Sequence, residues 1–437
     1  MNIILLSGGS GKRLWPLSND VRSKQFIKLF KNADGEYESM VQRMYRQIRK
    51  IDGDAQITVA TGRTQVPYLS NQLGEGIGIS VEPCRRDTFP AIALATAYLA
   101  DVRGVDPEQS VVVCPVDPYV EDDYFLALKA LGEQADKGQA NLVLMGMEPT
   151  EPSEKFGYII PETEQSVGFV KTFREKPSRE TAQAYIARGG LWNGGVFAYK
   201  LKYMLAKAHE LIDFKNYEDL FEKYESLTGI SFDYAVVEKE PRIQVMRFNG
   251  VWKDLGTWNT LTETIETVYG NGSMDETCRN VSIVNELDVP VLAMGLEDVV
   301  ISASAEGILV SDKRRSCDIK PFADKLDQDI KFAEKSWGSF RVIDVEGESM
   351  TLKVTLNPGH GMNYHSHRRR DEVWVVTAGE GYTVVDGMKQ RITQGDVITM
   401  QAGCRHTVRA VTELKLIEVQ LGKEISVNDK QKYPLEV

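Results

Sequence analysis

Short apolar runs alternate with helical patterns along the first part of the chain. The strand-length runs are Ile3–Leu6, Ile57–Ala60, Ser110–Cys114 and Leu142–Met145. The alanine-rich stretch Ala91–Leu99 and the stretch Leu201–Leu211 each predict a helix. Because strands that alternate with helices form parallel sheets covered on both faces, this region predicts an α/β domain.

From about Gly270 the pattern becomes short, β-branched and interrupted by polar turns. The apolar segments are Val281–Val284, Val291–Met294, Val299–Ser302 and Gly307–Val310. They predict a small all-β connector, compatible with a few rungs of a helical β stack. The charged stretch Lys320–Lys335 follows, and we expect it to be a linker that is helical after Pro321.

After Trp337 the chain is rich in predicted strands. These are Phe340–Val345, Met350–Leu356, Val373–Val376, Tyr382–Val385, Asp396–Met400 and Leu414–Gln420. Short strands separated by Gly, Asn and Asp turns indicate a compact β-barrel or jelly roll. The sequence therefore predicts three parts, residues 1–268, 269–335 and 336–437.

Composition narrows the class of protein. The chain has 437 residues and a net charge of −11, which argues against nucleic-acid or acidic-membrane partners. Five scattered cysteines suggest neither a disulfide framework nor a CxxC metal site and suit a reducing cytosol. No apolar run approaches the roughly 20 residues needed to span a bilayer. The opening Met1–Gly9 has no basic segment and predicts a buried strand rather than a signal peptide. We therefore expect a cytoplasmic multidomain protein.

A glycine-rich loop follows the first predicted strand directly. It contains Gly8, Gly9, Ser10 and Gly11, and Lys12, Arg13 and Lys24 add positive charge beside it. Consecutive backbone N–H groups in such a loop form an anion-binding nest. The loop is therefore either a phosphate cradle or a tight strand-to-helix turn with solvated basic residues, and it matches neither GxxxxGK[ST] nor GxGxxG.

A set of motifs in a fixed order gives this loop a context. They are Gly8–Ser18, Lys24–Phe26, Glu82–Ile92, Pro115–Asp117, Gly157–Ile159, Phe173–Pro177, Trp192–Phe197, Phe232–Lys239 and Trp252–Trp258. This order resembles the nucleotidyltransferases that make nucleotide sugars, most closely the mannose-1-phosphate guanylyltransferase (GDP-mannose pyrophosphorylase) family. Two positions depart from the family pattern: Lys12 replaces the usual threonine, and Ser23 the usual proline.

The resemblance implies a Rossmann-like nucleotidyltransferase domain that joins GTP and mannose 1-phosphate into GDP-mannose and pyrophosphate. Both reactants are anionic, so the protein mainly has to position them and neutralise their charge. A Mg²⁺ ion held by one or two carboxylates suits this role. Asp117 and Asp254 are the expected ligands, and each could instead be an ordinary turn or cap aspartate.

The family likeness also assigns the remaining groups. Arg13 and Lys24 are expected to neutralise the triphosphate, and Arg86 to join the glycine loop in nucleotide binding. The sugar phosphate is expected at Gly157, Glu175, Lys176 and Asn193. Guanine selection rests on the likeness alone, and the likeness is compatible with a homodimer.

Four of the five histidines lie near the end of the chain. His365, His367 and Glu372 fit the first motif of the cupin family, a double-stranded β-helix or jelly roll, and His406 fits the second. Alternate residues of a strand point to one face, so His365 and His367 can converge on one ion. A three-nitrogen, one-carboxylate site suits Zn²⁺, Fe²⁺, Mn²⁺ or Ni²⁺ alike.

A transferase followed by a cupin is similar to bifunctional enzymes that also isomerise mannose 6-phosphate to fructose 6-phosphate. Those proteins carry a QMHHHRxEHW run, of which this chain retains His367, Arg370, Glu372 and Trp374. Three interpretations stay open for the cupin: a metal site without isomerase activity, a true isomerase, and a non-catalytic sugar-phosphate-binding or assembly module.

Overall fold

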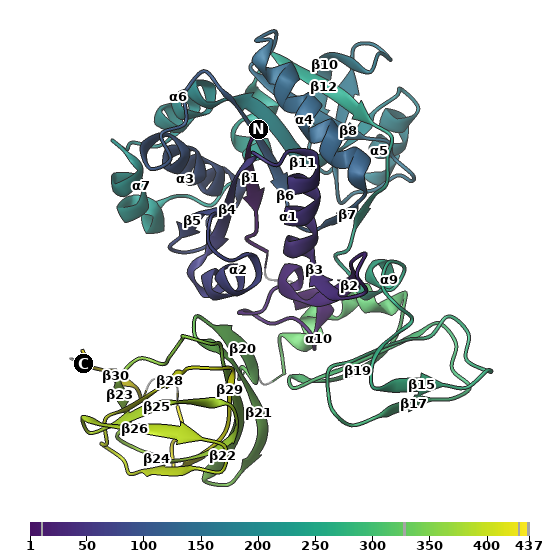
Figure 1. The fold of residues 1–437 in the computed structure, drawn as a ribbon. Helices are drawn as coiled ribbons and strands as arrows, with labels where there is room; N and C mark the ends of the chain where they lie inside the picture. The colour runs from purple at the N-terminus through teal and green to yellow at the C-terminus, as the bar shows by residue number, and fades with distance from the viewer. Residues whose placement is uncertain (10–11, 327–328, 427–428, 435–437) are drawn as a thin grey trace. The chain divides into compact units, whose positions relative to one another are not determined.

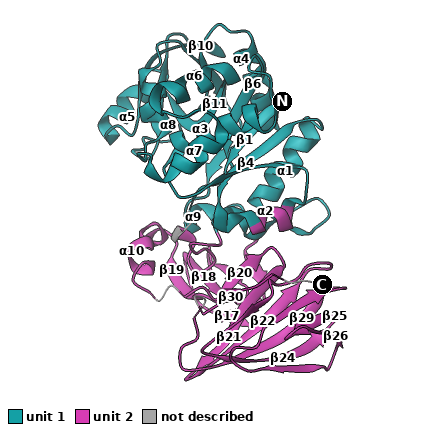
Figure 2. Ribbon diagram, turned by 90° about the vertical axis from the view of Figure 1, so that its left-hand side faces the viewer, with its two compact units in different colours: residues 1–10, 23–66, 73–265 teal, residues 11–22, 67–72, 266–437 magenta. Residues whose placement is uncertain are grey.

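Figures 1 and 2 show the computed structural model, which describes residues 1–9, 12–326, 329–426 and 429–434. The chain divides into two compact units. One contains residues 1–10, 23–66 and 73–265, and the other contains residues 11–22, 67–72 and 266–437. Two short early segments therefore pack with the C-terminal part of the chain. The division at 268 and 335 stays a prediction.

A nine-stranded sheet forms the centre of the first unit (Figure 1). Its strands in spatial order are β5 (Gly78–Glu82), β4 (Gln56–Gly62), β1 (Asn2–Leu6), β6 (Ser110–Pro115), β11 (Leu191–Lys200), β8 (Leu142–Met147), β12 (Ile243–Phe248), β10 (Val167–Arg174) and β9 (Gly157–Pro161). Strands β5, β4, β1 and β6 are parallel, so their carboxyl ends open on one edge of the sheet.

The expectation of a parallel sheet is wrong beyond β6. Strand β11 runs antiparallel to both β6 and β8, and β10 runs antiparallel to β9 and β12. Strands buried on both faces are continuous apolar runs in either direction, so their pattern does not reveal orientation. The α/β class itself is confirmed.

Helices pack around this sheet. They are α1 (Met40–Ile51), α3 (Thr88–Asp101), α4 (Asp122–Asp136), α5 (Arg179–Ile186), α6 (Leu201–Leu211), α7 (Tyr217–Lys223), α8 (Phe232–Ala235) and α9 (Trp258–Leu261), whereas α2 (Val66–Leu73) belongs almost entirely to the second unit. Helix α3 contains the predicted alanine-rich stretch and is buried along most of its length, which its small side chains permit. Helix α6 is confirmed with the predicted bounds. Among the described residues, no helix is both long and apolar enough to cross a membrane.

Two short ribbons complete the first unit. Strand β2 (Lys28–Lys31) pairs with β3 (Tyr37–Ser39), and β7 (Pro118–Val120) pairs with β13 (Trp252–Asp254). In the second ribbon Asp254 lies opposite Pro118, the residue after Asp117. This single pairing brings together two motifs that are far apart in the sequence.

The connector in the second unit is a stack of short strands. They are β14 (Val268–Gly270), β15 (Gly272–Met274), β16 (Ser282–Asn285), β17 (Val291–Ala293), β18 (Val299–Ser304) and β19 (Gly307–Asp312). Parallel pairing of β14, β16 and β18, and of β15 and β17, gives the rungs of the expected helical stack.

The helix predicted over Lys320–Lys335 is wrong in extent. Helix α10 covers Lys320–Ala323, and Phe332–Lys335 is strand β20, which pairs with β21 (Gly338–Glu346). Buried Ala333 and this pairing override the helix propensity of the charged residues around them.

Two sheets form the C-terminal domain. One sheet has the order β20, β21, β22 (Ser349–Leu356), β29 (Leu414–Leu421), β24 (Asp371–Ala378) and β27 (Val397–Met400), and the other β26 (Met388–Thr393), β25 (Glu380–Val385), β28 (His406–Ala410), β23 (His365–Ser366) and β30 (Gln431–Lys432). A core that includes Leu352, Val354 and Trp374 fills the space within the domain. The predicted jelly roll is confirmed, with each of its six predicted strands present.

Candidate functional site

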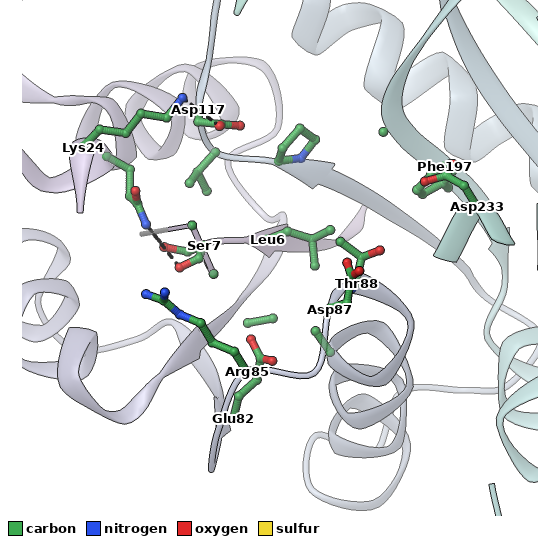
Figure 3. Close-up of a pocket in the computed structure, with 18 residues that line it drawn as sticks. Leu6, Ser7, Lys24, Glu82, Arg85, Asp87, Thr88, Asp117, Phe197 and Asp233 are labelled. Carbon is green, nitrogen blue, oxygen red and sulfur yellow. Dashed lines mark hydrogen bonds and ion pairs between the residues drawn. The ribbon is translucent and has the colours of Figure 1, made fainter. Parts of the chain in front are cut away.

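A pocket of about 390 Å³ opens at the carboxyl ends of β1, β5 and β6 in the first unit. This is the edge where ligands of open α/β sheets bind, and the volume lies in the range of small-molecule sites. Gly8, Gly9 and Lys24 line it, together with Glu82 and Asp117. Figure 3 shows Glu82 and Arg85 near one another and Asp233 at a different part of the pocket.

Lys24 connects the two predicted metal-binding aspartates. Its Nζ lies 2.9 Å from an oxygen of Asp117 and 3.7 Å from an oxygen of Asp254 (Figure 3 shows the contact with Asp117). The single positive charge of Lys24 partly offsets the two negative charges of Asp117 and Asp254. The β7–β13 ribbon holds these two carboxylates near each other. Both carboxylates keep substantial exposure, so their oxygens remain accessible to a hard cation.

The glycine loop is described only in part. Gly8 and Gly9 line the pocket, whereas Ser10, Gly11 and the side chain of Lys12 lie outside the described residues. Buried Gln25 donates to the carbonyl of Ser7, and Ser23 Oγ donates to the carbonyl of Gly9 at 2.7 Å. These bonds fix the start of the loop against the segment that carries Lys24.

Two predicted arginines are not among the described residues that line this pocket. Arg13 is exposed and belongs to the second unit. Arg86 donates to the carbonyls of Glu225 and Arg85. The neighbouring Arg85 lines the pocket instead. Arg85 was not predicted because the family motif over Glu82–Ile92 has one arginine position, and that position was matched to the adjacent Arg86.

The predicted sugar-binding residues form one cluster. Asn193 Nδ2 donates to Asp233 at 2.7 Å, and Glu175 pairs with Lys176 at 3.0 Å. A Cβ added to Gly157 would lie 2.4 Å from Glu175 Oε2, so only glycine fits against that carboxylate. Glu175 Oε2 is buried and has no hydrogen-bond partner within the part of the chain that the structure describes.

Asp233 belongs to this cluster and lines the pocket, although sequence reasoning gave it no role. Burial, helped by the negative charge of Glu175, raises the pKa of Asp233 to about 6. The sequence feature that could have identified Asp233 is its position in the motif Phe232–Lys239. Two adjacent acidic side chains and one amide offer several hydrogen-bond acceptors, which suits a polyhydroxylated ligand.

Glu82 is another acidic side chain that lines the pocket. Glu82 is buried at the end of β5, and Tyr224 donates to its Oε2 at 2.7 Å. Its Oε1 faces Gly8, where an added Cβ would be 3.5 Å away. Burial raises the pKa of Glu82, while the bond from Tyr224 opposes the rise.

The C-terminal domain brings its predicted histidines together. Ligand atoms of His365, His367 and His406 all lie within 4.8 Å of one another, and the side chains are buried. Glu372 joins them, with its oxygens 3.2 Å from Nε2 of His367 and 3.2 Å from Nε2 of His406. The four residues therefore share one buried site on β23, β24 and β28.

The protonation of these rings fits a bound cation. Each Nδ1 lies within hydrogen-bond distance of a backbone carbonyl, which can only accept, so each Nδ1 carries the proton and each Nε2 keeps its lone pair. The Nε2 of His406 then faces a carboxylate oxygen, with both atoms acceptors. Burial lowers the pKa of His365 to about 3 and also lowers that of His367, which favours neutral ligands.

Further polar groups lie in this domain beyond the predicted four. Arg370 Nε donates to Glu372 at 3.0 Å, and its Nη2 lies 3.1 Å from Nε2 of His367. Glu418 is buried on β29, where burial raises its pKa to about 7 and Gln420 donates to it at 2.5 Å. Sequence reasoning missed Glu418 because Lys415 and Gln420 in the same strand make a further polar residue look like a solvent-facing position.

A pocket at the carboxyl edge of an α/β sheet, lined by Gly8, Gly9, Lys24 and Asp117, has the location of the ligand sites of open α/β folds. The model of the nucleotidyl transferase family matches residues 2–269, and the chain belongs to this family. The cupin domain model matches residues 352–420.

Named relatives extend over the whole chain. A mannose-1-phosphate guanylyltransferase of Klebsiella pneumoniae is 28% identical over 98% of this chain and 97% of its own. The xanthan biosynthesis protein XanB of Xanthomonas campestris pv. campestris (strain B100) is 29% identical over 98% of this chain and 96% of its own. A crystal structure described as mannose-1-phosphate geranyltransferase from Thermus thermophilus covers 74% of this chain and 98% of its own, with 28% identity and a TM-score of 0.62.

Proposed function

We propose that this chain transfers the GMP group of GTP to mannose 1-phosphate. The observation that carries the proposal is the ammonium of Lys24 between Asp117 and Asp254 at the edge of a nucleotide-sized pocket. The relative from Klebsiella pneumoniae, which matches nearly the whole chain, supports the choice of both substrates.

In the proposed reaction a phosphate oxygen of mannose 1-phosphate forms a bond to the α-phosphorus of GTP. The bond from that phosphorus to the oxygen bridging to the β-phosphate breaks, and pyrophosphate leaves with the electron pair. Lys24 and Arg85 lower the repulsion between the two anions, and the N–H groups near Gly8 and Gly9 orient the triphosphate. Arg13, Lys12 and Arg86 stay predicted contributors.

Asp117 and Asp254 are proposed to hold Mg²⁺ during this reaction. Their exposed carboxylate oxygens are hard donors of the kind that this ion prefers. When bound, the ion supplies charge neutralisation and a fixed geometry for the phosphates. Lys24 contributes separately, because it keeps two like charges close together in the free protein.

The acidic cluster is proposed to bind the sugar. The buried Oε2 of Glu175 accepts a hydrogen bond from a sugar hydroxyl. Gly157 has no side chain, so its backbone allows the sugar to approach closely. Asn193 orients Asp233, which we add to the predicted set of Gly157, Glu175, Lys176 and Asn193. Lys176, paired with Glu175, is proposed to meet the sugar phosphate.

Glu82 is proposed to select the base. Guanine presents two neighbouring donors, its ring N–H and its exocyclic amino group, and an ionised carboxylate can only accept. Uracil and thymine present carbonyls on both sides of their single N–H, which a carboxylate repels. Tyr224 leaves Oε1 of Glu82 free to face the base.

A pyrophosphate-release assay that crosses GTP, ATP, UTP and dTTP with several hexose 1-phosphates tests the proposed function. We expect the highest kcat/KM for GTP with mannose 1-phosphate. Equal or higher turnover with another pair would contradict the assignment.

The same assay tests Glu82. In Glu82→Gln the amide offers both a donor and an acceptor, so preference for GTP over UTP should fall about 10- to 100-fold. Glu108→Gln is the matched control, because Glu108 is an exposed glutamate of the same unit that pairs with Lys200 and Lys202. An unchanged GTP preference in Glu82→Gln would remove Glu82 from base selection without affecting the proposed reaction.

The cupin site is proposed to hold a divalent transition metal through His365, His367, Glu372 and His406. Buried acceptor atoms that face one another without a proton between them support this proposal. Isomerisation of mannose 6-phosphate stays a prediction. Incubating the metal-loaded chain with mannose 6-phosphate tests it: formation of fructose 6-phosphate supports an isomerase, and saturable binding without turnover supports a sugar-phosphate-binding module.

Three broader predictions stand beside these proposals. We propose a cytoplasmic location, and we propose that two copies of the chain associate. We also propose residues 1–268, 269–335 and 336–437 as the functional division of the chain, since the family models match residues 2–269 and 352–420.

A further inference from the structure

The three histidines of the cupin site are held in two different ways. His365 Nδ1 lies 2.6 Å from the carbonyl of Asn363, and His406 Nδ1 lies 3.0 Å from the carbonyl of Cys404. Both acceptors come from two residues earlier in the same segment. His367 instead uses the carbonyl of Asp429, which is 62 residues further along the chain. The orientation of His367 therefore depends on the end of the protein.

Residues 429–433, here called the tail segment, run beside β23, which carries His365 and ends immediately before His367. Strand β30 pairs antiparallel with β23, with Lys432 opposite His365 and Gln431 opposite Ser366. The N–H of Tyr433 donates to the carbonyl of Tyr364 at 2.9 Å. On its other side β23 pairs with β28 at one position, His365 opposite His406. The tail segment thus supplies most of the backbone pairing of a two-residue strand.

Side chains of the tail segment add further bonds. The Asp429 carboxylate accepts from the N–H of Arg368 at 3.0 Å and of Arg369 at 2.8 Å, immediately after His367. The Tyr433 hydroxyl lies 3.1 Å from Ser366 Oγ. The guanidinium of Arg405, next to His406, lies over the Tyr433 ring at 4.2 Å from its centroid.

We propose that the tail segment is a positioning element of the metal centre. Its Asp429 carbonyl keeps the proton of His367 on Nδ1, and its carboxylate fixes the turn that follows the histidine. Groups that hold a ligand's second nitrogen orient the ring and raise its basicity, and their loss typically weakens metal binding about 10- to 100-fold. The proposal rests on the cupin metal site and not on the transferase reaction.

Titration of the metal-free full-length protein with Co²⁺ tests this, because the visible absorption of Co²⁺ reports both affinity and coordination. In Asp429→Ala we expect about 10- to 100-fold weaker binding and a changed spectrum, since the carboxylate bonds to the N–H groups of Arg368 and Arg369, which hold the Asp429 carbonyl against His367, are lost. Asp429→Asn keeps one accepting oxygen and should lie between the native protein and Asp429→Ala.

The matched control is Asp396→Ala. Asp396 likewise accepts a backbone N–H, from Thr393 at 2.7 Å, in a turn of the same domain that contacts none of the four ligands among the described residues. It should bind Co²⁺ with native affinity and spectrum. The near-ultraviolet signal of Trp374, whose ring lies 5.3 Å from that of His406, checks that each variant keeps its core.

Three outcomes would overturn the proposal. Native affinity and spectrum in Asp429→Ala would show that the Asp429 carboxylate, and the turn that it fixes after His367, do not position this ligand. An equal loss in Asp396→Ala would show a general loss of stability. A native chain that binds no Co²⁺ would remove the metal site itself, whereas turnover of GTP with mannose 1-phosphate would be unaffected by any of these results.

Discussion

The two sites of this chain treat their acidic groups in opposite ways. In the nucleotide pocket the side chains of Asp117 and Asp254 are 40% and 43% exposed, and one lysine balances both. In the cupin site the side chain of Glu372 is 3% exposed and lies among histidines that are 2% exposed. The pocket leaves its carboxylates in water, and the cupin removes its carboxylate from water.

This difference indicates how long each site keeps its ion. Exposed carboxylates can exchange a weakly held ion with every round of substrate binding, as Mg²⁺ sites with few protein ligands do. A buried ligand set with proton positions fixed by backbone carbonyls is ready for an ion that stays bound. We therefore expect the Mg²⁺ proposed for the first site to exchange with the substrates and the metal proposed for the second site to stay bound.

The largest expected effect is at the pocket. Asp254→Asn should lower kcat for GDP-mannose formation about 10³-fold, because a proposed ligand of the Mg²⁺ that neutralises the phosphates is lost. Pyrophosphate release measures the rate, and thermal unfolding checks the fold, which should be unchanged since the side chain is exposed.

Asp122→Asn is the control for this substitution. Asp122 is an aspartate of the same unit that pairs with Lys50 away from the pocket, so its variant should keep native turnover. Undiminished activity in Asp254→Asn would take this residue out of the site. Loss of cupin metal in Asp254→Asn would contradict the separation of the two sites.

The second effect is at the cupin. His367→Ala should weaken metal binding by more than about 100-fold, since a direct ligand is lost where supporting groups alone account for about 10- to 100-fold. Synthesis of GDP-mannose should continue at the native rate. Metal content after dialysis and the pyrophosphate assay measure the two quantities.

His360→Ala provides the comparison for this variant. His360 is an exposed histidine of the same domain whose Nδ1 lies 2.9 Å from the carbonyl of Pro358. It should retain metal fully. Equal metal loss in both variants would mean that histidine number, and not position, determines binding.

The smallest effect is a difference in pH dependence in the metal-free protein. The folded pKa of His365, about 3, lies below its usual 6.5, so the unfolded chain takes up the extra proton and the cupin loses stability as the pH falls below 6.5. The loss is at most about 1.4 kcal/mol per pH unit.

The contribution of Asp233 to stability changes with pH in the opposite direction to that of His365. Its folded pKa, about 6, lies above its usual 3.8, so its contribution to stability is complete below 3.8 and is lost as the pH rises through 6. Amide hydrogen exchange in each unit between pH 5 and 7 measures the two changes in stability. Parallel changes in the two units would contradict the contrast.

The sequence predicted four strands of the central sheet, the connector strands β16–β19, six strands of the C-terminal domain and helices α3 and α6, because buried apolar runs and helical periodicity are local signals. The long helices α1 and α4 were not predicted. Helix α6 matches its prediction residue for residue. Strand direction was not predictable, since β11 is apolar on both faces whichever way it runs. Strand β20 was missed because its pairing with β21 is a tertiary effect on a charged segment.

The residues of the candidate sites were likewise predictable where local geometry places them and not predictable where tertiary packing does. His365 and His367 lie together as their i, i+2 spacing predicted, because alternation along a strand is local geometry. Glu372 and His406 join them from other strands, as the resemblance to the cupin motifs implied. Arg85 and Asp233 line the pocket without having been predicted. Their positions depend on which way a loop turns and on how a short helix packs, and neither is encoded in the spacing of a motif.

The β7–β13 ribbon has a consequence for the family at large. One antiparallel pairing sets the spacing between Asp117 and Asp254, and the long intervening chain, which includes the cluster at Glu175 and Asn193, contributes nothing to that pairing. Insertions or exchanges in the intervening chain can therefore alter the acceptor that is recognised while the ion keeps its place. Under the roles proposed for Asp117 and Asp254, a change of product therefore needs no redesign of these two carboxylates.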